Sequence, residues 1–336
     1  MPGRGAQTCH KPLARSSSCA CFDRVGDGSF GGLFHPPKDA LLIGNFQRGL
    51  RVAIDYEKLK AWPFPDLEHE YSARDTILYA LGLGCGSDPM DARDLRFVYE
   101  DGLLALPTLA VILGYPGFWL KEPGTGVDWR KVLHGEQGLT LHAPLPAAGT
   151  VIGRTRITEI IDKGDKGALL LSERDIVDKS SGRLLATLRG TTVLRGDGHF
   201  GGPAGPAPEP HVLPQRQPDA CLDLPTLPQA ALIYRLSGDY NPLHADPQVA
   251  TAAGFKRPIL HGLCTYGVAA RAVLKLCCDN DPAALRQFDV RFSAPVYPGE
   301  TIRTEIWRDG GTISFRARVV ERDVVVLNNG LARLRP

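Results

Sequence analysis

The chain has 336 residues, enough for about two domains that each bury a core without disulfides or structural metal ions. Its formal net charge is +2 and its basic residues are scattered, which excludes the strong positive field that nucleic-acid binding needs. The longest apolar stretch, around residues 103–115, contains Pro107 and is shorter than the roughly 20 residues of a membrane-spanning helix. We therefore expect a soluble protein with no nucleic-acid partner and no membrane insertion.

The eight cysteines do not suggest a disulfide framework or a metal site. None forms a CxxC pair, and none lies at zinc-binding spacing from a pair of histidines. Reduced thiols in a cytoplasmic, metal-free enzyme are the expectation.

The N-terminal 45 residues lack the patterns of a folded segment. Residues 1–22 hold three basic residues and no acidic one, as organelle transit peptides do, but their amphipathic periodicity is poor. A disordered tail or an over-long reading frame explains the composition equally well. We expect residues 1–45 to be disordered, with organellar targeting left open.

Alternating or β-branched runs predict the strands of the first half of the chain. They fall near residues 138–143, 150–161, 168–177 and 183–194. Ser180, Ser181 and Gly182 supply a tight turn before the last of them.

A Gly/Pro-rich segment divides the chain. Between Gly196 and Pro218, 11 of 23 residues are Gly or Pro, so neither a helix nor a ladder strand is expected there. The predicted organisation is an N-terminal repeat, a linker and a C-terminal repeat, at residues 46–195, 196–218 and 219–336.

The second half begins with helix signals. Asp246 and Pro247 fit the N-cap and first position of a short helix, and Gly254 fits the residue after its end. A longer helix over residues 262–278 is apolar or small nearly all round, which indicates a helix enclosed by other structure. Strands follow near residues 288–292, 301–307, 312–321 and 324–334, with a hairpin signal at residues 309–311.

The two halves show a faint internal repeat. Residues 77–81 align with 232–236, and residues 142–151 align with 293–302. Both halves end in strands, and the order of elements matches. We therefore predict an α+β fold, a double hot dog in which each repeat is an antiparallel sheet wrapped around a helix.

The chemistry is concentrated in one turn, Ser-Gly-Asp-Tyr-Asn-Pro-Leu-His at residues 237–244. Asp239 and His244 lie five residues apart across a turn that Pro242 restricts, so both side chains could reach one water molecule. A carboxylate and an imidazole are the groups that general acid–base chemistry uses. Gly-Asp and Asn-Pro are also ordinary turn dipeptides, so this spacing alone does not establish a site.

Gly262 at the start of the buried helix is the second feature. Its backbone N–H could face an anionic oxygen, supported by the helix dipole. A tight start to a packed helix is the alternative explanation. His261 fits a capping or core histidine, and the sequence assigns it no catalytic role.

These motifs resemble the MaoC-like dehydratases, and specifically the (R)-specific enoyl-CoA hydratase 2 family. The resemblance rests on the hydratase 2 motif at residues 234–244 and on two further segments of the second half, at residues 258–267 and 295–299. Three segments of the first half, at residues 74–82, 97–100 and 132–137, resemble the N-terminal repeat of the hydratase portion of the peroxisomal multifunctional enzyme. The similarity spans roughly residues 50–335.

The resemblance implies roles for particular residues. Asp239 and His244 would flank the catalytic water, Asn241 would arrange the loop, and the Gly262 N–H would bind the thioester oxygen. Because Gly84 aligns with Asp239 and no histidine follows it, one active site per chain is implied.

Further residues follow from the same resemblance. Glu100 would take part in catalysis, while His134, Gly135, Lys163 and Phe292 would contact the acyl-CoA. Without the resemblance, Glu100 would be read as an exposed acid and Lys163 as part of a solvated turn.

The implied function is reversible hydration of trans-2-enoyl-CoA to (3R)-3-hydroxyacyl-CoA in fatty acyl-CoA metabolism, with no cofactor. The expected partners are the acyl-CoA thioester and a second copy of the chain as a homodimer. Three alternatives stay open: a hot-dog acyl-CoA thioesterase, a non-catalytic acyl-CoA binding module, and a hydratase that acts on a short branched or dicarboxylic enoyl-CoA. A binding module has no use for a paired acid and base.

Overall fold

One antiparallel sheet carries the ten strands that the computed structural model shows within residues 54–335, the part of the chain it describes. The segment predicted to be disordered, residues 1–45, lies outside that part. The strands of the first half are β1 (Leu67–Tyr71), β2 (Val132–Leu141), β3 (Gly149–Asp162), β4 (Ala168–Asp178) and β5 (Leu184–Leu194). Those of the second half are β6 (Ala220–Pro225), β7 (Leu285–Phe292), β8 (Thr301–Asp309), β9 (Thr312–Val319) and β10 (Val324–Leu334).

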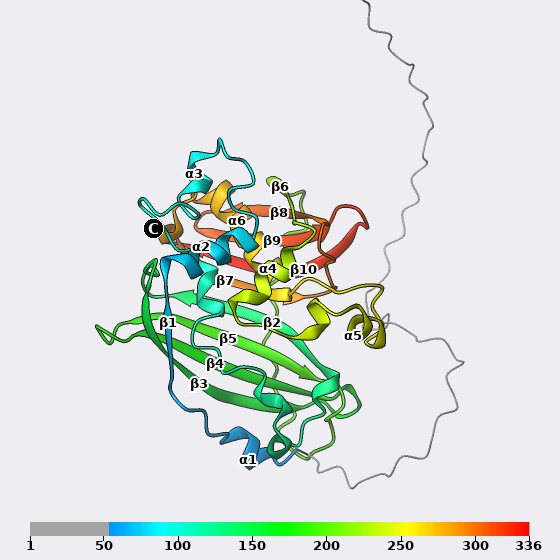
Figure 1. Cartoon of the computed structure of the whole chain (residues 1–336). Helices are drawn as coiled ribbons and strands as arrows, with labels where there is room; N and C mark the ends of the chain where they lie inside the picture. Colours follow the sequence, from blue (N-terminus) through cyan, green and yellow to red (C-terminus); the bar gives the residue numbers. More distant parts are fainter. Residues whose placement is uncertain (1–53, 336) are drawn as a thin grey trace, which may run out of the picture. The chain divides into compact units, whose positions relative to one another are not determined.

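The strand order repeats from the two edges of the sheet toward its centre. It runs β1-β3-β4-β5-β2 through the first half and, read from the other edge, β6-β8-β9-β10-β7 through the second (Figure 1). The halves meet where β2 pairs with β7, from Glu136 opposite Arg291 to Thr140 opposite Gln287. The predicted double hot dog is confirmed.

The helices are short, with one exception. The α-helices are α1 (Tyr56–Lys60), α2 (Ala73–Gly82), α3 (Ala92–Leu95), α4 (Ala230–Tyr234), α5 (Pro247–Ala252) and α6 (Gly262–Cys277). The 3-10 helices are η1 (Pro107–Val111), η2 (Trp119–Lys121), η3 (Pro123–Thr125), η4 (Trp129–Lys131), η5 (Gly164–Lys166), η6 (Arg235–Ser237), η7 (Pro242–His244) and η8 (Pro282–Ala284). Within the described residues, none is long and apolar enough to cross a bilayer.

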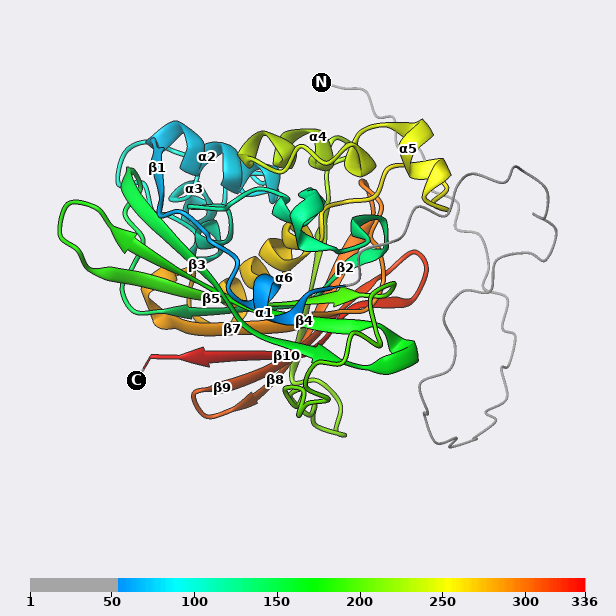
Figure 2. The same ribbon diagram turned by 90° about the horizontal axis from the view of Figure 1, so that it is seen from below.

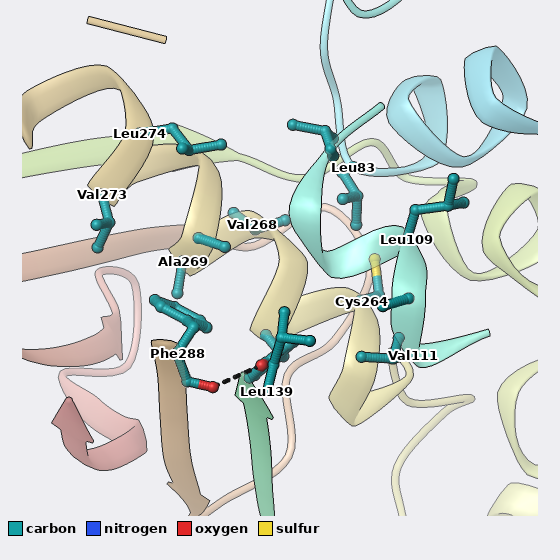
Figure 3. Close-up of a cluster of buried hydrophobic side chains, with 14 of the residues drawn as sticks. Leu83, Leu109, Val111, Leu139, Cys264, Val268, Ala269, Val273, Leu274 and Phe288 are labelled. Carbon is teal, nitrogen blue, oxygen red and sulfur yellow. Dashed lines mark hydrogen bonds between the residues drawn. The ribbon is translucent and has the colours of Figure 1, made fainter. Parts of the chain in front are cut away.

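Helix α6 is the predicted enclosed helix. Every residue from Cys264 to Leu274 is buried, and the helix lies between the sheet and a layer that includes α2 and α4 (Figure 2). Side chains of α6 pack beside Phe288 of β7 and Leu139 of β2 on one side and Leu109 of η1 on the other (Figure 3). This packing fixes the N-terminus of α6, and with it Gly262.

Within residues 54–335, only the second half contributes a long helix that packs against the sheet. The first half has no counterpart of α6 among the residues described; η1 packs there instead, against β2, β5 and α6. Gly114 has a φ of +55°, and Pro116 follows, so the helix cannot continue. The expectation of one central helix per repeat therefore holds only for the second half. Its helix α6 contacts strands of the second half and η1 of the first.

We did not predict the edge strands β1 and β6 from the sequence. Each pairs on one side only, β1 with β3 and β6 with β8. Both are short and contain charged residues, as edge strands commonly do, so their sequence signal is weak. Residues 196–218, for which we predict a linker, contain no helix or strand.

A buried ion pair ties α3 to α6. Arg271 and Asp94 are each 4% exposed, and Nη2 of the arginine lies 3.0 Å from Oδ2 of the aspartate. Asp94 also accepts a hydrogen bond from the Gly86 N–H, and Lys275 lies 3.2 Å from its other oxygen. Arg271 further donates to the Leu83 carbonyl. Helix α6 is thus held to the first half by charge as well as by apolar contact.

Candidate active site

The loop between α4 and α5 holds the predicted acid–base pair. Asp239 accepts a hydrogen bond from the Asn241 N–H at 3.2 Å, which closes the turn. The Asn241 side chain accepts a hydrogen bond from the Leu243 N–H at 3.1 Å. It thereby caps η7, whose first residue is Pro242. The turn places His244 at the end of η7, so the proposed loop-arranging role of Asn241 agrees with its contacts.

His244 points into the protein and is only 8% exposed. Its Nδ1 lies 2.8 Å from the Ile259 carbonyl, which can only accept, so Nδ1 carries the proton and Nε2 is left as an acceptor in the neutral ring. Burial lowers the pKa of His244 below its ordinary value, against the opposing effects of that hydrogen bond and of Asp239. At neutral pH the imidazole can therefore accept a proton.

His261 is the residue whose importance the sequence did not reveal. Its ring stacks on that of His244, with centroids 3.7 Å apart, and its Nε2 donates to the Asp239 carbonyl at 3.1 Å. The side chain is 1% exposed and does not cap α6, although His261 is the N-cap residue. It contacts both ends of the turn, at Asp239 and at His244. The one available signal was its position directly before Gly262.

Gly262 is the exposed first residue of α6, a helix that is buried from Cys264 to Leu274. The N–H groups of Cys264 and Thr265 donate to the His261 carbonyl. The first N–H groups of a helix lack an intrahelical acceptor, so the Gly262 N–H can bind an oxygen atom. A Cβ at Gly262 would lie 3.2 Å from the Phe292 ring, tighter than most real contacts. Glycine therefore keeps this helix end open beside the aromatic ring.

Phe292 and His134 complete the same site. Their ring centroids are 4.7 Å apart. Burial lowers the pKa of His134 to about 4, and the charge of Asp239 opposes this shift. Gly135 is the extra residue of a bulge in β2, because His134 pairs with Thr192 while Glu136 pairs with Thr191. Such bulges re-aim a side chain, and here the bulge turns His134 to the inner face of the sheet.

Two predicted site residues are not joined to this group by any hydrogen bond or ion pair within the described residues. Glu100 is exposed in the turn that follows α3. Lys163 is half-buried in the turn between β3 and β4, at the start of η5. Their catalytic and CoA-binding roles remain predictions.

The Asp239, His244 and His261 side chains have ligand atoms that all lie within 4.8 Å of one another. That spacing suffices for one small reactant such as water to contact both an acid and a base, and it would also suit a metal ion. A metal-free site remains a prediction.

Comparison with known proteins gives the family. The MFE-2 hydratase 2 N-terminal domain matches residues 69–196, and the MaoC like domain matches residues 211–329. The peroxisomal enoyl-CoA hydratase 2 of Arabidopsis thaliana is 41% identical over 285 residues, covering 80% of this chain and 92% of the relative. The chain belongs to the enoyl-CoA hydratase 2 family. The predicted resemblance is thereby confirmed.

Two further similar proteins are named dehydratases. The 3-hydroxyacyl-thioester dehydratase Y of Mycobacterium tuberculosis is 44% identical over 83% of this chain and 98% of its own. Among solved structures, the MaoC-like dehydratase of Phytophthora capsici superposes with a TM-score of 0.74 at 36% identity, covering 83% of this chain and 98% of that one.

We expect the stability of the fold to fall in mild acid because of the two stacked histidines. Burial lowers the pKa of both His244 and His261 from the ordinary value of 6.5, and the mutual effect of the rings adds to this for His261. The unfolded chain therefore binds protons that the folded one does not, so the free energy of unfolding decreases as the pH falls below 6.5. Urea unfolding at neutral pH and at about one to two units lower pH measures the loss.

The variant His261→Phe keeps a stacked ring and removes one of the two titrating groups. Its free energy of unfolding should therefore depend less on pH over the same interval. An unchanged pH dependence would show that His261 does not contribute.

Proposed function

We propose that this chain is a hydro-lyase that reversibly hydrates trans-2-enoyl-CoA to (3R)-3-hydroxyacyl-CoA in fatty acyl-CoA metabolism. One observation carries the proposal: the turn bearing Asp239 and His244 lies beside the open N-terminus of α6 at Gly262. Membership of the hydratase 2 family supports it, because relatives about 40% identical over most of their length are named enoyl-CoA hydratases.

The geometry supports the chemistry as follows. The Gly262 N–H and the helix dipole polarise the thioester carbonyl, which makes C3 of the enoyl group electrophilic. Water loses a proton to the Asp239/His244 pair as its oxygen bonds to C3. The same pair returns a proton to C2 as the double bond opens. One water is consumed and no cofactor takes part.

The geometry of the site argues against two of the alternatives, a thioesterase and a non-catalytic binding module. Such an enzyme would use a helix N-terminus and a carboxylate, but a histidine fixed by the Ile259 carbonyl and stacked on His261 would then lack a role. A non-catalytic binding module would need neither Asp239 nor His244. We therefore favour the hydratase.

Purified protein should hydrate crotonyl-CoA and trans-2-decenoyl-CoA, seen as loss of the enoyl-thioester absorbance. Coupling to 3R- and 3S-specific 3-hydroxyacyl-CoA dehydrogenases identifies the product, which we expect to be 3R. Release of free CoA thiol without hydration would instead support the thioesterase, and a predominant 3S product would contradict the proposed stereochemistry.

We also propose a homodimer that is located in the cytoplasm, with organellar targeting by the N-terminal segment as the alternative, since relatives of the chain are named peroxisomal. Exposed leucines lie on the paired helices α2 and α4 and on η6, at Leu81, Leu232 and Leu236, a surface suited to contact with a second copy. Light scattering of the purified chain tests the mass, and fractionation of cells tests the location.

A further inference from the structure

Strand β4 carries a charged residue on its inner face. Leu170 and Ile176 of this strand are buried in the core, and alternate residues of a strand face the same side. Arg174 therefore faces inward as well. It lies between Leu170, which belongs to one apolar cluster, and Ile176, which belongs to the other. Arg174 thus lies between two apolar clusters on the inner face of the sheet.

Arg174 has no acidic partner among residues 54–335. Its Nη2 donates to the Val111 carbonyl at 2.6 Å, its Nε is buried without a hydrogen-bond partner, and its guanidinium stacks over the Tyr115 ring, 5.3 Å from the centroid. Burial lowers the pKa of Arg174 to about 10, so it remains charged at neutral pH. A partly buried charge without a counter-ion costs free energy, which a bound anion would recover.

The arrangement around Arg174 is fixed by close backbone packing. Gly114, just before Tyr115, approaches Gly153 of β3 so closely that a Cβ there would lie 2.6 Å from the Gly153 Cα. The Gly114 N–H also donates to Nδ1 of His69 at 3.1 Å. The loop that carries Tyr115 is therefore held against β3, with the ring over the guanidinium.

The same region adjoins the acid–base pair. The negative charge of Asp239 acts on both His134 and Tyr115, and the positive charge of Arg174 acts on both as well. Both side chains are exposed to water, Tyr115 to 45%. Arg174 and Asp239 thus both lie near the exposed His134 and Tyr115 side chains.

We propose that Arg174 binds a carboxylate carried by the acyl chain of the substrate, so that the enzyme acts on enoyl-CoA thioesters with a second, remote carboxylate. This inference rests on the proposed function. Guanidinium and carboxylate form charge-assisted hydrogen bonds, the strongest pairing open to Arg174. The phosphates of CoA carry the same charge, but the inward position of Arg174 between two apolar clusters suits a group borne on the acyl chain.

The test compares two substrates of equal length, trans-2-decenoyl-CoA and its analogue with a terminal carboxylate, in wild-type and Arg174→Met proteins. A series of shorter and longer pairs locates the length that reaches the guanidinium. We expect the wild type to favour the carboxylated substrate at the best length. Arg174→Met should lower the ratio of the two kcat/KM values about 10- to 100-fold, the effect of a charged hydrogen bond.

The control is Arg156→Met. Arg156 lies on β3 and faces outward, paired with Glu173 and Asp175, so the ratio should not change. An equal fall of both kcat/KM values in Arg174→Met would mean that Arg174 contacts CoA or merely holds the Tyr115 loop, and would overturn the proposal.

The wild type alone also tests the idea, should Arg174→Met fail to fold. A wild-type enzyme that hydrates plain enoyl chains but shows no preference for a carboxylate at any length rejects this inference and leaves the hydratase proposal intact. Failure to hydrate either substrate rejects the hydratase proposal itself.

Discussion

Asp239→Asn should lower the turnover of enoyl-CoA hydration about 10²- to 10⁴-fold, the usual contribution of a general acid or base. Asparagine has nearly the same shape, and its side-chain oxygen can still accept from the Asn241 N–H, so the turn should persist. What is lost is a group that exchanges a proton with water. Steady-state rates with crotonyl-CoA, at saturating concentration, measure the change.

A second aspartate nearby provides the control. Asp246 accepts hydrogen bonds from Gln248 and Val249 as the N-cap of α5, a role that asparagine fills equally well. Asp246→Asn should therefore leave turnover unchanged. Turnover of the Asp239→Asn protein within about threefold of the wild type would remove Asp239 from the mechanism.

Asp94→Ala should destabilise the fold by about 3–5 kcal/mol, because it leaves the buried Arg271 guanidinium without its counter-ion. The Gly86 N–H loses its acceptor as well, and Lys275 loses one of its two acidic partners. Chemical denaturation monitored by circular dichroism gives the free energy of unfolding of each protein.

Removing an acid from an exposed ion pair, that of Asp66 with Arg154, provides the control for Asp94→Ala. Both side chains are more than half exposed, so Asp66→Ala should cost no more than about 1 kcal/mol. Equal small effects of the two substitutions would show that the Asp94 carboxylate is not needed to compensate Arg271.

Much of the fold was predictable because its signals are local. Alternation identified the strands of both halves, and Asp246 followed by Pro247 marked the start of α5. The weak signals were those that depend on long-range pairing: the edge strands β1 and β6, whose partners β3 and β8 lie far along the chain. The first half lacks a counterpart of α6 where Gly114 has a positive φ and Pro116 follows, a local signal that our sequence analysis did not use.

The site was predictable in part for the same reason. Asp239, Asn241 and His244 lie on one short turn, so their spacing carries the information. His261 stacks on His244 because the start of α6 lies against that turn. Arg174 contacts Tyr115 because the loop after η1 packs on the sheet. A search for charged residues in phase with the buried Leu170 and Ile176 would have found Arg174.

The mirrored strand order around the β2–β7 junction is what two identical subunits would produce by joining edge to edge. It therefore suggests an ancestral pair of single-repeat chains that became one gene by duplication and fusion. In such a pair any change would appear in both copies at once. After fusion each copy could evolve separately, so that one kept Asp239 while the other has Gly84 at the aligned position. The N-terminal repeat, no longer needed for catalysis, could then evolve to bind the substrate that the C-terminal repeat converts.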